Sequence, residues 1–391
     1  GLFDAPEKNP YTKIKADVIN SEKHIKLALE AAQKSIVLIK NNNTLPLSKD
    51  IKSMMVLGPN ASNVDVLLGN YNGISPNMVT FVEGIMNKVS PSTRVEYRMG
   101  FLLDRPNINP IDWASDEAKG HDAVVVFMGI HTSMEGEEGE AIASPYKGDR
   151  LDAGLPKNQM DYLKMLRQKV KKPLIVVLTG GSPICEPELE NLADALIMAW
   201  YPGEQGGNAL ANILFGEISP SAKMPLTFPK SLNDLPAYDD YSMKGRTYRY
   251  MKAEPFVPFG FGLSFTQFEY SNLKLSAPSI TKDGKVVAEV TVKNAGKMDA
   301  DEVVQLYITD EKSSVEVPQY ALKSFKRISL RAGESKVVTF DITSDMLKVV
   351  NNDGKSVLEP GSFVIYTGGS LPTARSITMG ASQYQKAILK Y

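Results

Sequence analysis

The sequence predicts an α/β unit followed by an all-β unit, because two hydrophobic patterns follow each other along its 391 residues. Up to about residue 230, short apolar runs alternate with amphipathic stretches, and from residue 268 onward a period-two alternation takes over. Domains hold ~150 residues each, so a chain of this length also exceeds one ordinary core. We therefore expect a linker over residues 1–20, an α/β sandwich over residues 21–230, a connector over residues 231–266 and a β-sandwich over residues 267–391.

The first unit is expected to contain a mostly parallel sheet with helices on both faces. Its strands should be nearly continuous in Val, Ile, Leu and Met, as in a sheet that is covered on both sides. Five runs meet this description: residues 35–40, 53–58, 122–129, 173–180 and 194–200. Amphipathic stretches predict helices between them, over residues 22–33, 157–170 and 207–215. Strands that alternate with helices in this way form a parallel sheet between helical layers.

The second unit is expected to be an antiparallel β-sandwich of immunoglobulin or fibronectin type III kind. Its clearest strand, residues 285–294, places Val286, Ala288, Val290 and Val292 on one face. Further strands are predicted over residues 302–310, 337–342 and 362–367, with Gly-containing turns between them. About 120 residues of such strands suit a sandwich. The connector before it is rich in Pro, Tyr, Phe and Gly without either period, and its aromatic residues predict that it packs across the domain junction.

Composition excludes several classes of function. The 44 Lys and Arg residues are balanced by 45 Asp and Glu residues, so no net charge attracts nucleic acid or an anionic membrane. No apolar run approaches the ~20 residues that span a bilayer. The single cysteine, Cys185, excludes an intrachain disulfide, and one Cys with three His argues against a structural zinc site. We expect no nucleic-acid partner, no membrane partner and no metal, nucleotide or redox cofactor.

An acidic stretch follows the strand predicted over residues 122–129. Residues 134–149 (MEGEEGEAIASPYKGD) contain four glutamates within six positions: Glu135, Glu137, Glu138 and Glu140. Ligands of open α/β sheets bind at the carboxyl ends of strands, so this loop is well placed for function. Neighbouring negative charge raises the pKa of a carboxyl group, and a general acid needs such a raised pKa. From the cluster alone, a solvated acidic loop or a Ca²⁺ site remains an alternative.

Three other features need an explanation. Residues 201–207 (YPGEQGG) follow a strand and open a helix, but they match neither GxGxxG nor the phosphate-loop pattern. We expect these glycines to allow close packing of the helix start on the sheet.

Ser182 lacks a GxSxG elbow and a paired histidine, which excludes a serine hydrolase. His131 lies just beyond the strand predicted over residues 122–129 and could hydrogen-bond a ligand, although an isolated histidine is more often a plain loop residue.

Five segments resemble glycoside hydrolase family 3, in the order in which that family has them. Residues 201–229 (YPGEQGGNALANILFGEISPSAKMPLTFP) resemble the signature of the C-terminal half of the family. Residues 36–47 and 56–73 are similar to the first strands of that half. Residues 245–270 resemble the segment that leads into the family's fibronectin-like domain, and residues 290–309 the start of that domain. The resemblance covers nearly the whole chain.

The resemblance implies that half of an enzyme is present. The family's usual layout is a (β/α)8 barrel, an α/β sandwich and often a fibronectin-like domain. Residues 2–8 (LFDAPEK) look like the stretch just after the barrel, and the chain starts without an initiator Met. We therefore expect a chain without the barrel and without the aspartate nucleophile that the family carries there. A barrel domain or chain of the same enzyme is the implied partner.

The resemblance also implies the roles of several loop residues. Relatives carry Gly-Glu-Gly or Glu-x-Glu in the corresponding loop, followed by Asp-Arg. Aligning that pattern selects Glu137 as the general acid/base, with Glu135 and Glu138 as register alternatives. Asp149 and Arg150 match the Asp-Arg pair. Arg150 could orient a carboxylate or hydroxyl of the substrate, or instead form an ion pair with Asp149 or a loop glutamate. Asp149, Arg150 and His131 are the candidates for substrate binding.

The implied reaction is retaining exo-hydrolysis of terminal β-xylosyl or β-glucosyl residues from a β-linked oligosaccharide or glycoside. Residues 69–73 and the loop over residues 135–150 look closer to the β-xylosidase branch.

The competing hypotheses are a non-catalytic carbohydrate-binding or scaffolding fragment and a doubly wound nucleotide-binding protein. A chain that docks a barrel should expose a large apolar patch on the Glu137 side. The family resemblance also suggests a periplasmic or secreted location, and a homodimer is left open.

Overall fold

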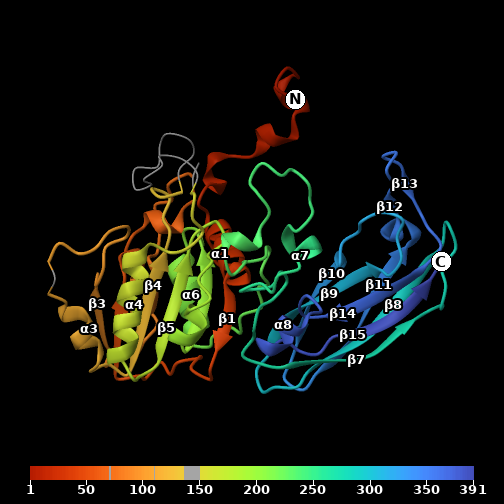
Figure 1. Cartoon of the computed structure of the whole chain (residues 1–391). Helices are drawn as coiled ribbons and strands as arrows, with labels where there is room; N and C mark the ends of the chain where they lie inside the picture. The colour runs from red at the N-terminus through yellow and green to blue at the C-terminus, as the bar shows by residue number, and fades with distance from the viewer. Residues whose placement is uncertain (70–71, 110, 136–149) are drawn as a thin grey trace.

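The computed structural model describes residues 1–69, 72–109, 111–135 and 150–391, in which two folded units lie side by side (Figure 1). The first is a sheet between two layers of helices, and the second is a β-sandwich. Both agree with the fold predicted from the hydrophobic patterns. Among the described residues, no helix combines the length and the apolar character that a membrane span requires.

The sheet of the first unit has six strands in the described part of the chain, in the order β1-β6-β5-β4-β2-β3. Only β1 runs antiparallel to its neighbour, so the sheet is mostly parallel, as predicted. Its strands are β1 (Val37–Asn41), β2 (Ser53–Leu57), β3 (Arg94–Arg98), β4 (Ala123–Gly129), β5 (Leu174–Thr179) and β6 (Ala195–Trp200). The strand order reverses between β2 and β4, because β2 leads outward to β3 whereas β4 leads inward to β5.

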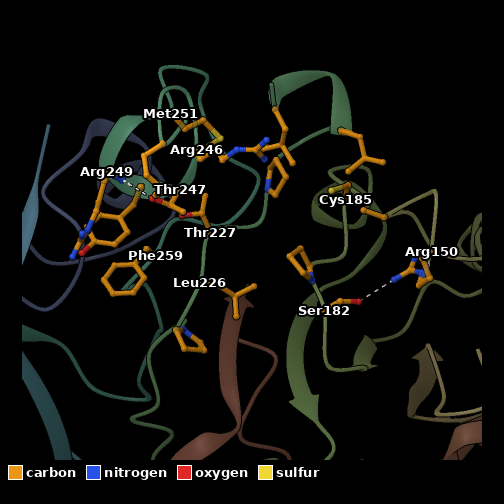
Figure 2. A pocket seen from close by; sticks show the side chains of 18 of the residues that line it. Arg150, Ser182, Cys185, Leu226, Thr227, Arg246, Thr247, Arg249, Met251 and Phe259 are labelled. Carbon is orange, nitrogen blue, oxygen red and sulfur yellow. Dashed lines mark hydrogen bonds between the residues drawn. The ribbon is translucent and has the colours of Figure 1, made fainter. Parts of the chain in front are cut away.

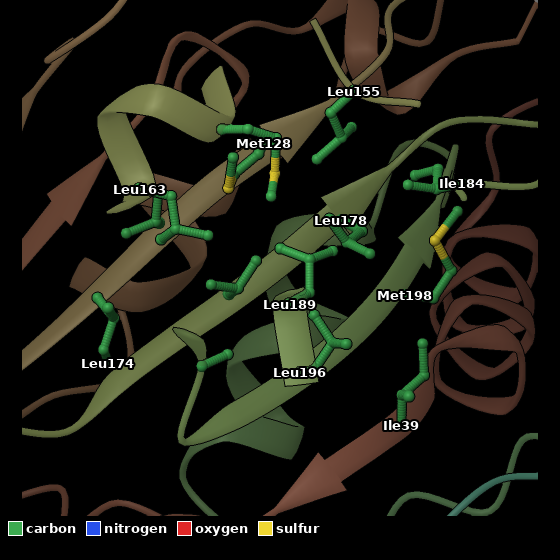
Figure 3. Close-up of a cluster of buried hydrophobic side chains, with 14 of the residues drawn as sticks. Ile39, Met128, Leu155, Leu163, Leu174, Leu178, Ile184, Leu189, Leu196 and Met198 are labelled. Carbon is green, nitrogen blue, oxygen red and sulfur yellow. The ribbon is translucent and has the colours of Figure 1, made fainter. Parts of the chain in front are cut away.

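Helices cover both faces of this sheet and bury two separate apolar clusters. One face carries α1 (Glu22–Ser35), α2 (Phe81–Met86) and α6 (Gly206–Leu214). The other carries α3 (Trp113–Ala118), α4 (Lys157–Lys169) and α5 (Leu189–Leu192). On that second face, Leu163 of α4 and Leu189 of α5 pack on Met128, Leu178 and Leu196 of the central strands (Figure 3). Burial on both faces accounts for the continuous apolar runs of these strands.

The second unit packs a four-stranded sheet, β10-β9-β14-β15, against a three-stranded sheet, β11-β8-β7. Its strands are β7 (Phe268–Leu275), β8 (Lys285–Asn294), β9 (Ala300–Asp310), β10 (Ala321–Leu330), β11 (Ser335–Thr343), β14 (Ser362–Gly368) and β15 (Gln385–Lys390). A small ribbon, β12 (Val349–Val350) with β13 (Ser356–Val357), and helix α8 (Ala374–Thr378) complete it. Val286, Ala288, Val290 and Val292 of β8 are all buried in the core between the sheets, which confirms the predicted alternation.

The connector crosses between the units and is largely packed. It contains one short helix, α7 (Thr247–Tyr250), and its Phe256 and Phe261 are fully buried in the core of the first unit. Tyr248 stacks on Phe259 with ring centroids 4.0 Å apart. These contacts agree with the packing predicted from its aromatic residues. A loop of the same connector behaves differently, because its Tyr238 is 92% exposed.

A buried ion-pair cluster also joins the two units. Lys223 of the first unit lies 3.2 Å from the carboxylate of Glu302 in the sandwich, and it donates to the Gly262 carbonyl at 3.0 Å. The Tyr270 hydroxyl donates to the same carboxylate at 2.8 Å. Close by, Arg327 of the sandwich donates to the Ser221 hydroxyl at 2.7 Å. We call Lys223, Glu302 and Tyr270 the junction cluster.

Candidate active site

Strands β4, β5 and β6 each end in a sharp backbone turn, and these turns bring together the segments that follow them. We call the first residues after a strand its exit. Gly129 closes β4 with φ +135°, and Gly180 follows β5 with φ +142°. A Cβ atom at Gly129 would lie 2.1 Å from the Thr179 carbonyl oxygen, so only glycine allows this approach. The third exit, Trp200 at the end of β6, has φ +59°, which is strained for a bulky residue. Because β6, β5 and β4 are adjacent, the segments that leave them meet at one edge of the sheet.

Glu135 is held at this edge by donors from the two neighbouring exits. One of its carboxylate oxygens accepts the backbone N–H of Gly181 at 3.1 Å and the Tyr201 hydroxyl. The other accepts the Ser182 hydroxyl. Burial, together with the nearby Glu135 carboxylate, raises the pKa of the Tyr201 phenol far above its ordinary value of 10.0. The phenol therefore keeps its proton and acts as a donor over the whole working pH range.

Arg150 meets the same serine from the other side. Its Nη1 donates to the Ser182 hydroxyl at 3.1 Å (Figure 2), and its Nη2 donates to the Gly154 carbonyl. The Ser182 hydroxyl thus donates to Glu135 and accepts from Arg150. We call Glu135, Arg150, Gly181, Ser182 and Tyr201 the strand-end clamp.

Two residues of the clamp, Glu135 and Arg150, flank the candidate catalytic segment in the sequence. Residues 136–149, which include Glu137, Glu138 and Asp149, lie outside the described residues. What the structure describes are the two residues that flank this segment, and both are bonded to Ser182. The roles predicted for Glu137, Glu138, Asp149 and Arg150 stay predictions.

His131 lies at the exit of β4, next to the point where the strand order reverses. It is buried, accepts the backbone N–H of Ser133 at Nδ1 (3.1 Å), and its Nε2 lies 2.9 Å from the amide nitrogen of Asn63. Burial lowers its pKa below the ordinary value of 6.5, and the carboxylate of Asp65 opposes this shift only in part. His131 is therefore neutral at pH 7. Substrate binding by His131 stays a prediction, since its described contacts join the exits of β2 and β4.

Gly206 and Gly207 of residues 201–207 have a packing role. Helix α6 begins at Gly206, and a Cβ atom on Gly207 would lie 1.9 Å from the Thr80 carbonyl oxygen. A Cβ atom on Gly84 of α2 would in turn lie 2.0 Å from the Gly207 carbonyl oxygen. The predicted close packing is confirmed, but its partner is helix α2 and not the sheet.

Between the strand exits and the connector lies a pocket of about 690 Å³ (Figure 2). Leu226, Met251 and Phe259 give it apolar walls, and Arg150 and Ser182 of the clamp line its edge. Cys185 also lines the pocket, but burial raises the pKa of its thiol to about 11, so the thiol is protonated and unreactive at neutral pH. Within the described ranges, no cluster of three or more His, Cys, Asp and Glu side chains could hold a metal ion.

Exposed apolar side chains accumulate on segments that rise beside this edge. In Figure 1 the N-terminal segment and the connector loop before α7 extend on the side where the parallel strands end. Their large apolar residues are more than a third exposed: Leu2, Phe3, Tyr11, Ile14, Val18, Ile19, Leu232, Tyr238, Tyr241 and Met243.

Sequence reasoning missed Tyr201 and Ser182 as parts of this site. Tyr201 was visible only as the first residue of the glycine-rich motif, and Ser182 only as a serine without the surroundings of a nucleophile. Only their positions in the sequence could have pointed to this site, because each residue follows closely after a buried strand.

Comparison with known proteins identifies the family. The profile described as the glycosyl hydrolase family 3 C-terminal domain matches residues 36–265, and that of the fibronectin type III-like domain matches residues 302–371. A β-xylosidase from Formosa agariphila is 37% identical over 385 residues, which cover 95% of this chain and 51% of the xylosidase. A periplasmic β-glucosidase from Salmonella typhimurium is 34% identical over 407 residues, covering 94% of this chain and 52% of the glucosidase.

Solved structures agree with this assignment. A β-glucosidase from Erythrobacter marinus superposes with a TM-score of 0.83 at 30% identity, covering 100% of this chain and 53% of the glucosidase. A family 3 exo-β-xylosidase in complex with a xylobiose aziridine probe gives a TM-score of 0.82 at 28% identity, covering 98% and 51%. The chain thus spans about half the length of the relatives that it matches. It belongs to glycoside hydrolase family 3, as the α/β sandwich and the fibronectin type III-like domain of that family's C-terminal half.

Proposed function

We propose that this chain is the C-terminal half of a retaining exo-β-glycosidase that removes terminal non-reducing β-D-xylosyl or β-D-glucosyl residues. The observation that carries the proposal is the strand-end clamp, which fixes both flanks of residues 136–149 at the carboxyl edge of the sheet. Family 3 relatives named β-xylosidase and β-glucosidase support the reaction class.

Glu137 is proposed as the general acid/base. Among the register alternatives, Glu135 is the least suited to this role, because three donors of its own chain already occupy its carboxylate. An acid/base must be able to turn toward the glycosidic oxygen. This supports placing the role on Glu137, with Glu138 as the remaining alternative.

The nucleophile is proposed to be an aspartate on a barrel domain that docks on this edge. That carboxylate would attack the anomeric carbon while Glu137 gives its proton to the leaving oxygen. Glu137 would then take a proton from the water that releases the sugar. The two carboxyl groups of a retaining enzyme lie ~5–5.5 Å apart, which requires firmly docked domains. The exposed apolar residues of the N-terminal segment and connector loop are consistent with such docking.

The location and the preferred sugar are parts of the same proposal. Residues 69–73 favour a β-xyloside, with a β-glucoside as the alternative. The Salmonella relative is named as periplasmic, which supports a periplasmic or secreted location.

The test uses the complete enzyme, in which this chain acts with its barrel domain, on 4-nitrophenyl β-xyloside and β-glucoside. Glu137→Ala should lower kcat by ~10²–10⁴-fold, which is the usual contribution of general acid/base catalysis. Added azide should restore turnover and yield the β-glycosyl azide, because azide attacks the glycosyl-enzyme without a general base. Glu138→Ala is the matched comparison.

The outcomes separate the parts of the proposal. A complete enzyme that hydrolyses neither glycoside contradicts the function and favours a non-catalytic carbohydrate-binding fragment. Rescue of Glu138→Ala instead of Glu137→Ala would move the acid/base by one position and leave the function intact. This chain alone should hydrolyse neither substrate, because the nucleophile is proposed to lie on the barrel.

A further inference from the structure

The strand-end clamp joins the segments that follow β4, β5 and β6 through side-chain hydrogen bonds. Ser182 stands at its centre, since its hydroxyl contacts both Glu135 and Arg150. Tyr201 reaches Glu135 from the exit of β6. The two charged side chains that the Ser182 hydroxyl contacts stand directly before and directly after residues 136–149 in the sequence.

We propose that Ser182 and Tyr201 are positioning residues for the general acid/base. The proposal rests on the function proposed above. Glu135 stands two positions before Glu137, and Arg150 directly follows residues 136–149, so the clamp holds the two residues that flank this segment at one serine. Tying both ends of a loop to one point reduces the number of conformations that the loop can adopt. A displacement of ~1 Å in a catalytic group can cost ~10²-fold in rate, so this restriction matters for catalysis.

The clamp residues are themselves rigidly held. Trp200 adopts its left-handed conformation, while its indole N–H donates to the Ser35 carbonyl at 3.0 Å and its ring meets Phe228 edge-on at 6.0 Å. This geometry turns Tyr201 off the sheet toward Glu135. Gly181 leaves room for the contact, since a Cβ atom there would lie 3.2 Å from the Tyr201 ring and 3.4 Å from the Glu135 carboxylate. Fixed supports of this kind are what a precisely placed catalytic group requires.

The dependence of the hydrolysis rate on the leaving group distinguishes loss of proton donation from a purely structural effect. Help from a general acid matters most when the leaving group is a poor one and least when it is an activated phenol. Loss of positioning should therefore slow the hydrolysis of phenyl or alkyl glycosides while nearly sparing 2,4-dinitrophenyl glycosides. A general loss of folded enzyme would slow both to the same extent.

The experiment compares kcat/KM of the complete enzyme on phenyl and 2,4-dinitrophenyl β-xyloside. Tyr201→Phe and Ser182→Ala should lower the phenyl value by ~10–100-fold and the dinitrophenyl value by less than about threefold. Ser182→Thr, which keeps the hydroxyl, should restore most of the loss. Tyr162→Phe is the matched control, because Tyr162 is buried in the same unit and donates to Asp112 instead.

Equal losses on both substrates, or no loss on either, would overturn the positioning role while the wild-type enzyme still demonstrates hydrolysis. A wild-type enzyme inactive on these two xylosides and on the corresponding phenyl and 2,4-dinitrophenyl β-glucosides would instead contradict the proposed function. Loss in Tyr162→Phe with the same selectivity would also overturn the proposal, because it would show that any buried tyrosine of this unit has the effect.

Discussion

The strand-end clamp and the junction cluster both join segments that are distant in sequence, but they differ in burial and in chemistry. The clamp is half-buried and holds its carboxylate with a backbone N–H, a serine and a tyrosine. In the junction cluster Glu302 and Tyr270 are buried, and Glu302 pairs with the partly buried Lys223. A partly exposed cluster can lose one donor and admit water, whereas a buried charge that loses its partner has no substitute. We therefore expect the clamp to govern catalysis and the junction cluster to govern stability.

The largest effect on stability is expected from Lys223→Met. This change leaves the buried Glu302 carboxylate with the Tyr270 hydroxyl and the charge of Arg327 but without the cation that contacts it, and removal of one partner from a buried pair costs ~3–5 kcal/mol. Urea denaturation of the chain at pH 7 measures the free energy of unfolding. Lys285→Met is the matched control, since the Lys285–Asp341 pair is more than half exposed and should contribute within about 0.5 kcal/mol. A loss below about 1 kcal/mol for Lys223→Met would mean that the junction cluster contributes no more to the free energy of unfolding than the clamp does.

A smaller loss of stability is expected from Tyr201→Phe. Glu135 keeps the Gly181 N–H and the Ser182 hydroxyl, so the change removes one hydrogen bond of a half-buried carboxylate, worth about 1 kcal/mol. The same denaturation series measures it. Together with the loss of activity proposed for this variant, the result would separate the clamp from the junction cluster. A destabilisation as large as that of Lys223→Met would mean that the clamp is also a major structural support.

Much of this fold was predictable, because buried strands consist of continuous apolar runs. Residues 122–129 are such a run, and they contain strand β4. The strands that were missed carry a different pattern. Edge strand β3 reads Arg-Val-Glu-Tyr-Arg and is only partly buried, so its sequence resembles a loop. In the sandwich, β10 alternates its small, charged and apolar residues without a clean period. A sheet edge exposes a strand to solvent, and solvent exposure removes the hydrophobic signal.

The candidate site was predictable only in part, for a similar physical reason. The glutamate-rich segment and Arg150 are visible because they are local in sequence and resemble a family motif. Ser182 and Tyr201 join them only through the order β6-β5-β4, which places three strand exits next to one another. Nothing in residues 180–182 or 201–207 taken separately specifies Glu135 as a partner.

The smallest effect is expected at His131, whose contribution should depend on pH. Burial lowers its pKa in the folded chain below the ordinary 6.5, so between these two values the unfolded chain binds more protons than the folded chain. Stability from this group is complete above pH 6.5 and is lost as the pH falls through the lower, folded-state value. The free energy of unfolding should therefore fall more steeply between pH 7 and pH 5 in the wild-type chain than in His131→Gln. His24→Gln, at an exposed position of α1, serves as the control and should keep the wild-type slope. An equal slope in wild type and His131→Gln would mean that His131 is protonated as readily in the folded chain as in the unfolded one, and that the contact between the exits of β2 and β4 does not require a neutral imidazole.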